Sequence, residues 1–177
     1  FFGLGASVME KLGVSTSQLP GGEIFGALEE GAIDASEFSQ PAIDQRLGFH
    51  KIVKYNYFPG WHQQATIFEL LVNKDAWSKM SKGQQATVEN TCKASMTNAI
   101  AEGEAMQFPV MAKAKEQGVE IRYWNDTMLK TFEQKWTEVA SEKSAADPFF
   151  KKVWDDLSTF REGYDLWESN AFLPRSR

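Results

Sequence analysis

The residues of this chain that could do chemistry gather in two short segments, and the first spans residues 32–41. It carries Glu37 directly before Phe38. A carboxylate beside an aromatic ring offers one hard oxygen ligand next to an apolar wall. This suits a small carboxylic acid held through a cation, because two anions cannot share a dry site without a bridging charge. A loop carboxylate that faces water is the alternative interpretation.

The second segment, residues 55–64, combines aromatic residues, a Pro-Gly turn and the consecutive amides Gln63 and Gln64. Amide oxygens can coordinate Na⁺ or Ca²⁺, and Trp61 can pack against the apolar side of a ligand. A purely structural aromatic loop is the alternative here. The adjacent His62 is more typical of a hydrogen-bonded loop residue than of a metal ligand.

Motifs for catalysis are missing from the sequence. The two histidines, His50 and His62, lie in no G-x-S-x-G elbow, phosphate-binding loop, H-E-x-x-H helix or dinucleotide fingerprint. The acidic pairs at 29–30 and 155–156 fall in helical patterns and are expected to be solvated. We therefore expect a binding protein and no enzyme.

Charge and hydropathy exclude other classes. The net charge is −5, and Lys and Arg cluster only in pairs such as Lys151-Lys152, so a nucleic-acid surface is not expected. No stretch approaches the roughly 18 apolar residues of a membrane span. The single cysteine, Cys92, cannot form an internal disulfide and is expected to be a small core residue on a helix.

The sequence around the first segment predicts a strand, a helix and a second strand. We predict strands over residues 14–19 and 32–35 around a helix over 23–30, which is a βαβ unit of a parallel sheet. A further helix is expected to start at Pro41 and run to Leu47. Glu37 would then follow a strand at the carboxyl edge of the sheet, where open α/β folds bind ligands.

In the middle of the chain, we predict a buried strand over residues 65–73 and another strand over residues 119–124 from their apolar composition. Between them, Ser81 and Gln84 have the form of a capping box that opens a helix running to about Gln117. Pro109 is expected to kink or interrupt that helix. One buried stripe is predicted along it from the spacing of Cys92, Met96, Ala99, Ile100 and Gly103.

Two helices complete the chain, one capped by Asn125-Asp126 and running to about Ser141, the other opening at Asp147-Pro148. The last carries more aromatic surface than one exposed helix should, so it is expected to pack on this lobe, a missing lobe or a second subunit. Its apolar residues are Phe149, Phe150, Val153, Trp154, Leu157, Phe160, Tyr164 and Trp167.

These segments together resemble the solute receptors of TRAP transporters. The stretch 20–35 (PGGEIFGALEEGAIDA) is similar to the family signature, and Ser36-Glu37-Phe38 resembles its short binding segment. Residues 57–62 (YFPGWH) resemble the branch that binds 2-oxo acids and similar monocarboxylates. The closing segment 151–167 resembles the long C-terminal helix of the family.

The resemblance implies a periplasmic α/β receptor with binding-protein-like lobes, a parallel or mixed sheet, a long central helix and a long C-terminal helix. It would close around a small organic acid and deliver it to membrane permease subunits. A Na⁺ or Ca²⁺ ion would bridge the acid to the Glu37 side chain, the Phe38 backbone carbonyl and the Gln63 amide, with Gln64 as the register alternative. Trp61 and Phe38 would line the cavity. At the position of Phe38, that branch tends to have Trp.

The resemblance also implies that residues 1–177 are the C-terminal portion of a two-lobed protein. The family's arginine, which forks onto the substrate carboxylate, would lie before Phe1, so the chain is expected to be a fragment with an incomplete site. Residues 143–177 form a C-terminal helical segment and a candidate dimerisation element, since members of this branch can exchange that helix. A receptor or sensor for a dicarboxylate or sugar acid, or a helix-mediated interaction domain, are the alternatives.

Overall fold

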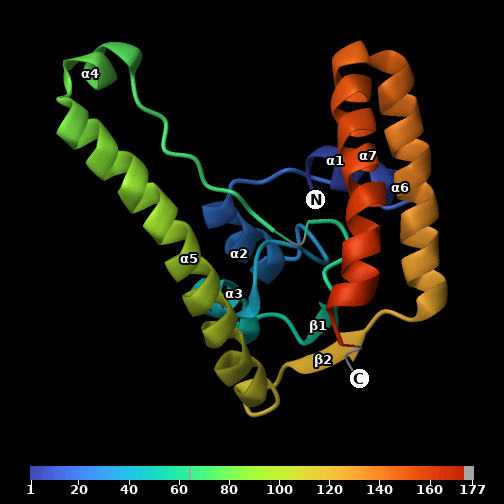
Figure 1. Cartoon of the computed structure of the whole chain (residues 1–177). Coiled ribbons are helices and arrows are strands. Elements are labelled where there is room, and N and C mark those ends of the chain that lie inside the picture. The colour runs from blue at the N-terminus through green and yellow to red at the C-terminus, as the bar shows by residue number, and fades with distance from the viewer. Residues whose placement is uncertain (64, 174–177) are drawn as a thin grey trace. The chain divides into compact units, whose positions relative to one another are not determined.

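The computed structural model describes residues 1–63 and 65–173 as two compact units. One unit is formed by residues 1–17 and the chain from 125 onward, the other by residues 18–124. Helices dominate both, and the only sheet of the described part is one pair of parallel strands (Figure 1). The predicted α/β class, with parallel strands, a long central helix and a long C-terminal helix, is confirmed.

The first unit consists of α1 (Gly3–Lys11), α6 (Asp126–Ala146) and α7 (Pro148–Ala171). The two long helices begin where the sequence predicts. The Asn125 side chain accepts a hydrogen bond from the backbone N–H of Met128, which satisfies one of the unpaired donors of the first turn of α6. The Asp147 side chain accepts hydrogen bonds from the backbone N–H groups of Phe149 and Phe150 and so caps α7. Helix α6 ends at Ala146, five residues later than the predicted Ser141.

The core of this unit lies where α1 packs on α6. Val8 and Val139 are almost completely buried, at 0% and 1% exposure. At the end of α1, the Lys11 ammonium donates to Glu142 at 2.7 Å. The ring of Trp136 on α6 meets the ring of Trp154 on α7 edge-on, with centroids 5.4 Å apart. The aromatic residues of α7 therefore pack on this lobe only in part.

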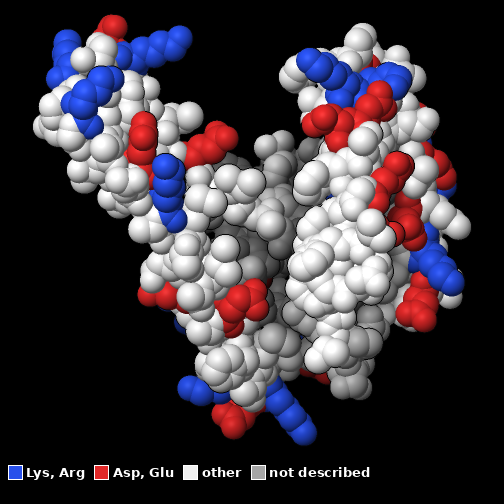
Figure 2. Space-filling model, viewed as in Figure 1, with Lys and Arg blue, Asp and Glu red and all other residues white. Residues whose placement is uncertain are grey.

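Most of the apolar stripe of α7 stays at the surface. Figure 2 shows a broad uncharged area along this helix. Phe149 is 72% exposed, Phe160 66% and Trp167 62%. Trp154 therefore packs on α6 as predicted, whereas packing of the remaining stripe on a further lobe or a second subunit stays a prediction.

The second unit is organised by strands β1 (Tyr55–Phe58) and β2 (Glu120–Tyr123), which pair in parallel with Tyr55 opposite Glu120. The predicted strand over 119–124 is confirmed. The Tyr57 ring stacks on Trp124 at 4.5 Å between centroids, and the guanidinium of Arg122 lies 3.8 Å from the Tyr55 ring centroid. Aromatic and cation–π contacts across the pair therefore add to its few backbone hydrogen bonds.

Helices α2 (Gly21–Glu29) and α3 (Pro41–Arg46) and the 3₁₀ turn η1 (Phe49–Lys51) lie ahead of β1. Both helices match the prediction, and α3 carries its proline in the first turn. The predicted βαβ unit is wrong, because residues 14–19 and 32–35 form no strand in the described structure. Neither segment has a neighbouring strand to complete a backbone ladder, and extended propensity alone does not make a strand.

Helix α4 (Lys74–Lys79) and the long helix α5 (Lys82–Lys113) complete this unit. The capping box is confirmed, since the Gln84 N–H donates to the Ser81 hydroxyl and the Ser81 N–H to the Gln84 side chain. Helix α5 continues through Pro109 and ends earlier than the predicted Gln117. None of the described helices in either unit is long and apolar enough to cross a membrane.

Two predictions of burial in this unit are wrong. The stripe along α5 is exposed, with Met96 at 66% and Ile100 at 69%, and Cys92 is exposed as well. The predicted strand over 65–73 is not a strand in its described residues, and Ile67 and Phe68 are 86% and 91% exposed. Sequence patterns identified apolar faces correctly, but the described chain supplies no element to cover them.

Asp44, in the first turn of α3, is an acid whose burial affects stability. Its Oδ1 atom is buried without a hydrogen-bond partner in the described structure. Burial raises the pKa of Asp44 from 3.8 to about 6; the Ser39 backbone N–H opposes this rise, and the charge of Glu37 adds to it. Since the folded protein holds this proton more tightly than the unfolded chain, the residue costs stability once it ionises.

We predict that the free energy of unfolding falls, through Asp44, as the pH rises from 4 to 7. Over this range, the free energy of unfolding of Asp44→Asn should rise by about 1 kcal/mol relative to that of the native protein. This value is reduced for solvent screening, because Asp44 is only partly buried. Urea unfolding at several pH values measures the difference, and exposed Asp34 gives the control Asp34→Asn. Parallel pH profiles for native protein and Asp44→Asn would show that the buried carboxyl does not titrate in this range.

Candidate functional site

The two segments singled out in the sequence meet in the structure. The Oε2 atom of Glu37, in the loop before α3, lies 3.7 Å from Nε2 of His62, in the segment after β1. Both side chains are largely covered, with exposures of 29% and 21%. Residues 25 positions apart in the sequence therefore face each other, and this contact marks the candidate site.

His62 does not neutralise Glu37 at neutral pH. Burial lowers the pKa of His62, and the charge of Glu37 opposes that shift without reversing it. A separation of 3.7 Å is also too long for a good hydrogen bond. In the part of the chain that is described, neither lysine nor arginine forms an ion pair with Glu37. The carboxylate is therefore largely covered and has no lysine or arginine of the described residues as an ion-pair partner.

Phe38 is held in place by two neighbours. Its ring lies where a Cβ on Gly21 would come within 2.9 Å, so α2 approaches it closely only because Gly21 has no side chain. On the other side it meets the Phe49 ring edge-on at 6.0 Å. The Ser36 hydroxyl donates to the Glu37 carbonyl at 3.0 Å, whereas the Phe38 carbonyl accepts no hydrogen bond within the described residues. That carbonyl is thus available to a ligand.

Trp61 and Gln63 flank His62. The rings of Trp61 and His62 lie 4.9 Å apart and are tilted by 46°. The Gln63 amide donates to the Thr66 hydroxyl at 3.1 Å, which orients its N–H₂ group and leaves Oε1 for another partner. In the described structure Glu37 and His62 are in contact and Trp61 adjoins them, whereas no direct contact joins Gln63 to Glu37. Gln64 lies outside the described residues.

The available ligand atoms suit a hard cation. Across residues 1–63 and 65–173, no group of three or more His, Cys, Asp or Glu side chains is placed to hold a metal ion. Glu37, Phe38 and Gln63 instead offer one carboxylate, one backbone carbonyl and one amide, all through oxygen. Na⁺ and Ca²⁺ accept such sets and complete them with water or substrate oxygens, whereas zinc sites need nitrogen or sulfur ligands.

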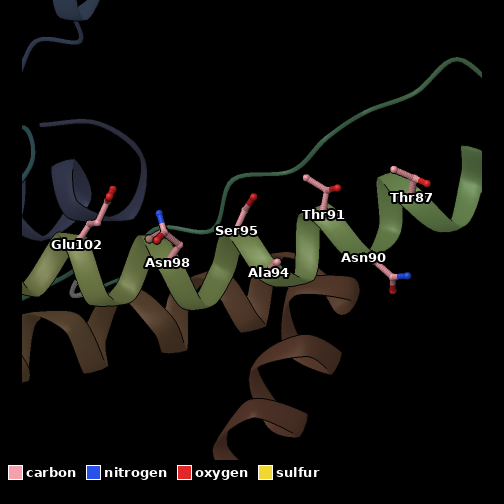
Figure 3. A pocket seen from close by; sticks show the side chains of 8 residues that line it. Thr87, Asn90, Thr91, Ala94, Ser95, Asn98 and Glu102 are labelled. Atoms are coloured by element: carbon pink, nitrogen blue, oxygen red, sulfur yellow. The ribbon is translucent and has the colours of Figure 1, made fainter.

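A shallow hollow lies along α5. Figure 3 shows that Thr87, Thr91, Ser95 and Glu102 point to the same side of the helix. It is completed by Asn90, Ala94, Asn98 and Ala99. Small polar side chains on one exposed helix, with a single acid among them, do not form a set that could bind a metal or perform catalysis. This hollow is therefore not the candidate site.

Residues that support the site from other elements were not found by sequence reasoning. The side chain of Gln107, on α5, accepts a hydrogen bond from the Ala42 N–H and donates to the Gln40 side chain. These partners are 65 and 67 positions away, and no motif connects them. The only local signal was that Gln40, at the start of a predicted helix, is a poor N-terminal cap.

Comparison with known proteins connects this geometry to a family. Residues 3–147 match the family model described as bacterial extracellular solute-binding protein, family 7. A monocarboxylate 2-oxoacid-binding periplasmic protein of Nostoc sp. is 29% identical over 165 residues, which are 93% of this chain and 45% of the relative.

Solved structures give the same result. A TRAP transporter solute-binding protein from Bordetella bronchiseptica, with calcium and picolinate in its active site, matches with a TM-score of 0.85 and 30% identity over 97% of this chain and 51% of its own. One from Colwellia psychrerythraea, with bound calcium and pyruvate, matches with a TM-score of 0.86 and 28% identity over 96% of this chain and 52% of its own.

A third structure, from Pseudoalteromonas atlantica, contains sodium and pyruvate and matches with a TM-score of 0.83 and 27% identity over 96% of this chain and 52% of its own. The chain thus spans about half the length of the relatives it matches. The family model covers more than half of the chain, and the same fold recurs in each structure. The chain therefore belongs to family 7 of the bacterial extracellular solute-binding proteins.

Proposed function

We propose that this chain is the C-terminal portion of a two-lobed periplasmic receptor that binds a small monocarboxylate, a 2-oxo acid or a close analogue, through a bridging cation. The receptor would pass its ligand to the permease subunits of a TRAP-type transporter. The observation that carries the proposal is the contact between Glu37 and His62, which unites the two segments expected to bind the ligand. The calcium and sodium in the similar structures support the cation.

The chemistry follows from charge. Glu37 and the carboxylate of the acid would repel each other in a covered site, and neutral His62 cannot offset this repulsion. A Ca²⁺ or Na⁺ ion between them turns repulsion into two attractive contacts. The Phe38 carbonyl and the Gln63 amide oxygen would complete the protein ligands, and Trp61 would cover the apolar part of the acid.

We predict that pyruvate or a longer 2-oxo acid stabilises the full-length receptor only when Ca²⁺ or Na⁺ is present. At a hundred times its dissociation constant the acid should add about 2.7 kcal/mol to the free energy of unfolding. Glu37→Gln should lose this effect, since the amide keeps the size of the side chain and removes its charge. Thermal-shift measurements with and without the cation test this.

The matched control is Glu30→Gln, which changes an exposed acid at the end of α2. It should keep the whole ligand-dependent shift. Stabilisation of Glu37→Gln equal to that of the native receptor would rule out Glu37 as the cation ligand. Cation-dependent stabilisation by dicarboxylates or sugar acids alone would favour a receptor for that other class of solute.

The apolar segment 67–72 supports a two-lobed receptor. Its side chains are exposed although their composition is that of a buried strand, and Phe68 reaches 91% exposure. We propose that the part of the receptor beyond this chain covers the segment and pairs with its backbone. The similar structures are about twice as long as the chain, which leaves room for such a lobe.

Amide hydrogen exchange should therefore show strong protection of residues 67–72 in the full-length receptor and rapid exchange in the isolated chain. Backbone amides exchange slowly only where stable hydrogen bonds hold them. Strand β1 (Tyr55–Phe58), which is already paired, serves as the internal control and should be protected in both samples. Rapid exchange of residues 67–72 in the full-length receptor would contradict the proposal.

The aromatic face of α7 supports a second proposal, association of two copies through the C-terminal helix. Phe160, Tyr164 and Trp167 are exposed on this helix, and the rings of Phe160 and Tyr164 stack on each other at 5.9 Å. The Bordetella protein is described as a dimer. Burying such a face between copies removes apolar surface from water.

We predict that the full-length receptor has the mass of a dimer in light scattering and that Phe160→Glu shifts it to the mass of a monomer. A charge placed on the apolar face would have to be buried in the interface, at a large cost. Thr159→Glu adds the same charge at the neighbouring exposed position and should remain dimeric. A native receptor that stays monomeric at high concentration would contradict the proposal.

A further inference from the structure

The start of α3 is capped by a residue of another helix. The N–H of Ala42, in the first turn, has no acceptor within its own helix, and Ala42 is only 4% exposed, so water does not reach it freely. Gln40, which precedes the helix, makes no side-chain capping bond. The Oε1 atom of Gln107 on α5 accepts the Ala42 N–H at 3.0 Å instead.

The amide of Gln107 is fully used in this position. Its Nε2 donates to the Gln40 side chain at 2.9 Å and to the Gly103 carbonyl at 2.7 Å. The bond to Gly103, on its own helix, fixes the direction of the side chain. One amide thus joins α5 to both Gln40 and Ala42, the residues on either side of Pro41.

This connection lies next to the candidate cation ligands. Glu37 and Phe38 precede Gln40 by only three and two residues, and the Phe38 ring is already held against Gly21 and Phe49. The loop is therefore fixed at the Phe38 ring and at Gln40. Without the hydrogen bonds of Gln107, the Glu37 carboxylate could move relative to the Phe38 carbonyl. Cation sites require each ligand atom to lie within a few tenths of an ångström of its ideal distance from the ion.

We propose that Gln107 is a positioning residue of the ligand site, which holds the loop of Glu37 and Phe38 in the geometry that binds the cation. This inference rests on the proposed function, because it deepens the same site. Gln107 would touch neither cation nor acid. It would act through the hydrogen bonds to Ala42 and Gln40, in the way that outer residues orient metal ligands.

The test measures Ca²⁺ binding to the full-length receptor by calorimetry, with Gln107→Ala and Gln107→Glu as variants. We expect Gln107→Ala to weaken Ca²⁺ binding about tenfold, the range typical of lost outer-shell contacts. Gln107→Glu keeps an acceptor for the Ala42 N–H and loses the donations to Gln40 and to the Gly103 carbonyl. It should recover most of the affinity if capping of α3 is the main contribution.

The matched control is Gln117→Ala, which removes the hydrogen bond from the Gln45 amide of α3 to Gln117, in the turn after α5. It removes a contact of the same kind between α3 and the segment after α5, away from the loop of Glu37, so Ca²⁺ affinity should change less than twofold. Equal losses in Gln107→Ala and Gln117→Ala would show a purely structural role and overturn the inference.

Hydrogen exchange without any cation separates this inference from the proposed function. Gln107→Ala should speed exchange over residues 37–43, and β1 (Tyr55–Phe58) should exchange as in the native receptor. Unchanged exchange over 37–43 would overturn the positioning role. A native receptor that binds neither Ca²⁺ nor Na⁺ would contradict the proposed function, and the exchange data would still decide whether Gln107 orders the loop.

Discussion

Repulsion between two carboxylates is the constraint on which the proposed ligand site depends. Two like charges 4 Å apart repel by about 4 kcal/mol at the effective dielectric of a protein surface. Glu37 is covered, its neighbour His62 favours the neutral form, and no lysine or arginine of the described chain pairs with it. An acid that binds beside Glu37 therefore needs a positive charge close to that carboxylate, and we propose that a bridging cation provides it. The oxygen ligands proposed for this site, from Glu37, Phe38 and Gln63, are of the kind that Na⁺ and Ca²⁺ prefer.

The architecture of the second unit brings the loop of Glu37 and the segment of His62 together. Strand β1 is fixed by its parallel partner β2 and by the stacking of Tyr57 on Trp124, so the segment that follows it leaves from a defined place. The loop before α3 is fixed by the Phe38 ring and by the bonds of Gln107. Glu37 and His62 meet because each lies within a few residues of such a fixed point.

Features set by neighbouring residues could be predicted from the sequence. The capping box at Ser81, the caps Asn125 and Asp147, and Pro41 at the start of α3 were all predicted correctly, because each depends on bonds within a single turn. Features that need a distant partner could not. Residues 14–19, 32–35 and 65–73 have the composition of strands, yet the described chain offers them no ladder.

The candidate site shows the same contrast between residues that local sequence identifies and residues whose role depends on distant partners. Glu37, Phe38 and Trp61 drew attention through residue type and through likeness to a family, and the structure brings Glu37 to the segment of Trp61. Sequence reasoning assigned His62 only a loop role and did not foresee its contact with Glu37. Gln107 was missed altogether, since its partners are more than 60 positions away and an amide carries no signature of its role.

A bridging cation at Glu37 is tested most directly by a crystal structure of the full-length receptor grown with pyruvate and Ca²⁺, with the ion located by anomalous scattering. We expect one Ca²⁺ ion between the Glu37 carboxylate and the carboxylate of the acid, with oxygen ligands at about 2.3–2.6 Å. Pyruvate bound with no ion between it and Glu37, or an ion held elsewhere in the receptor, would contradict this expectation.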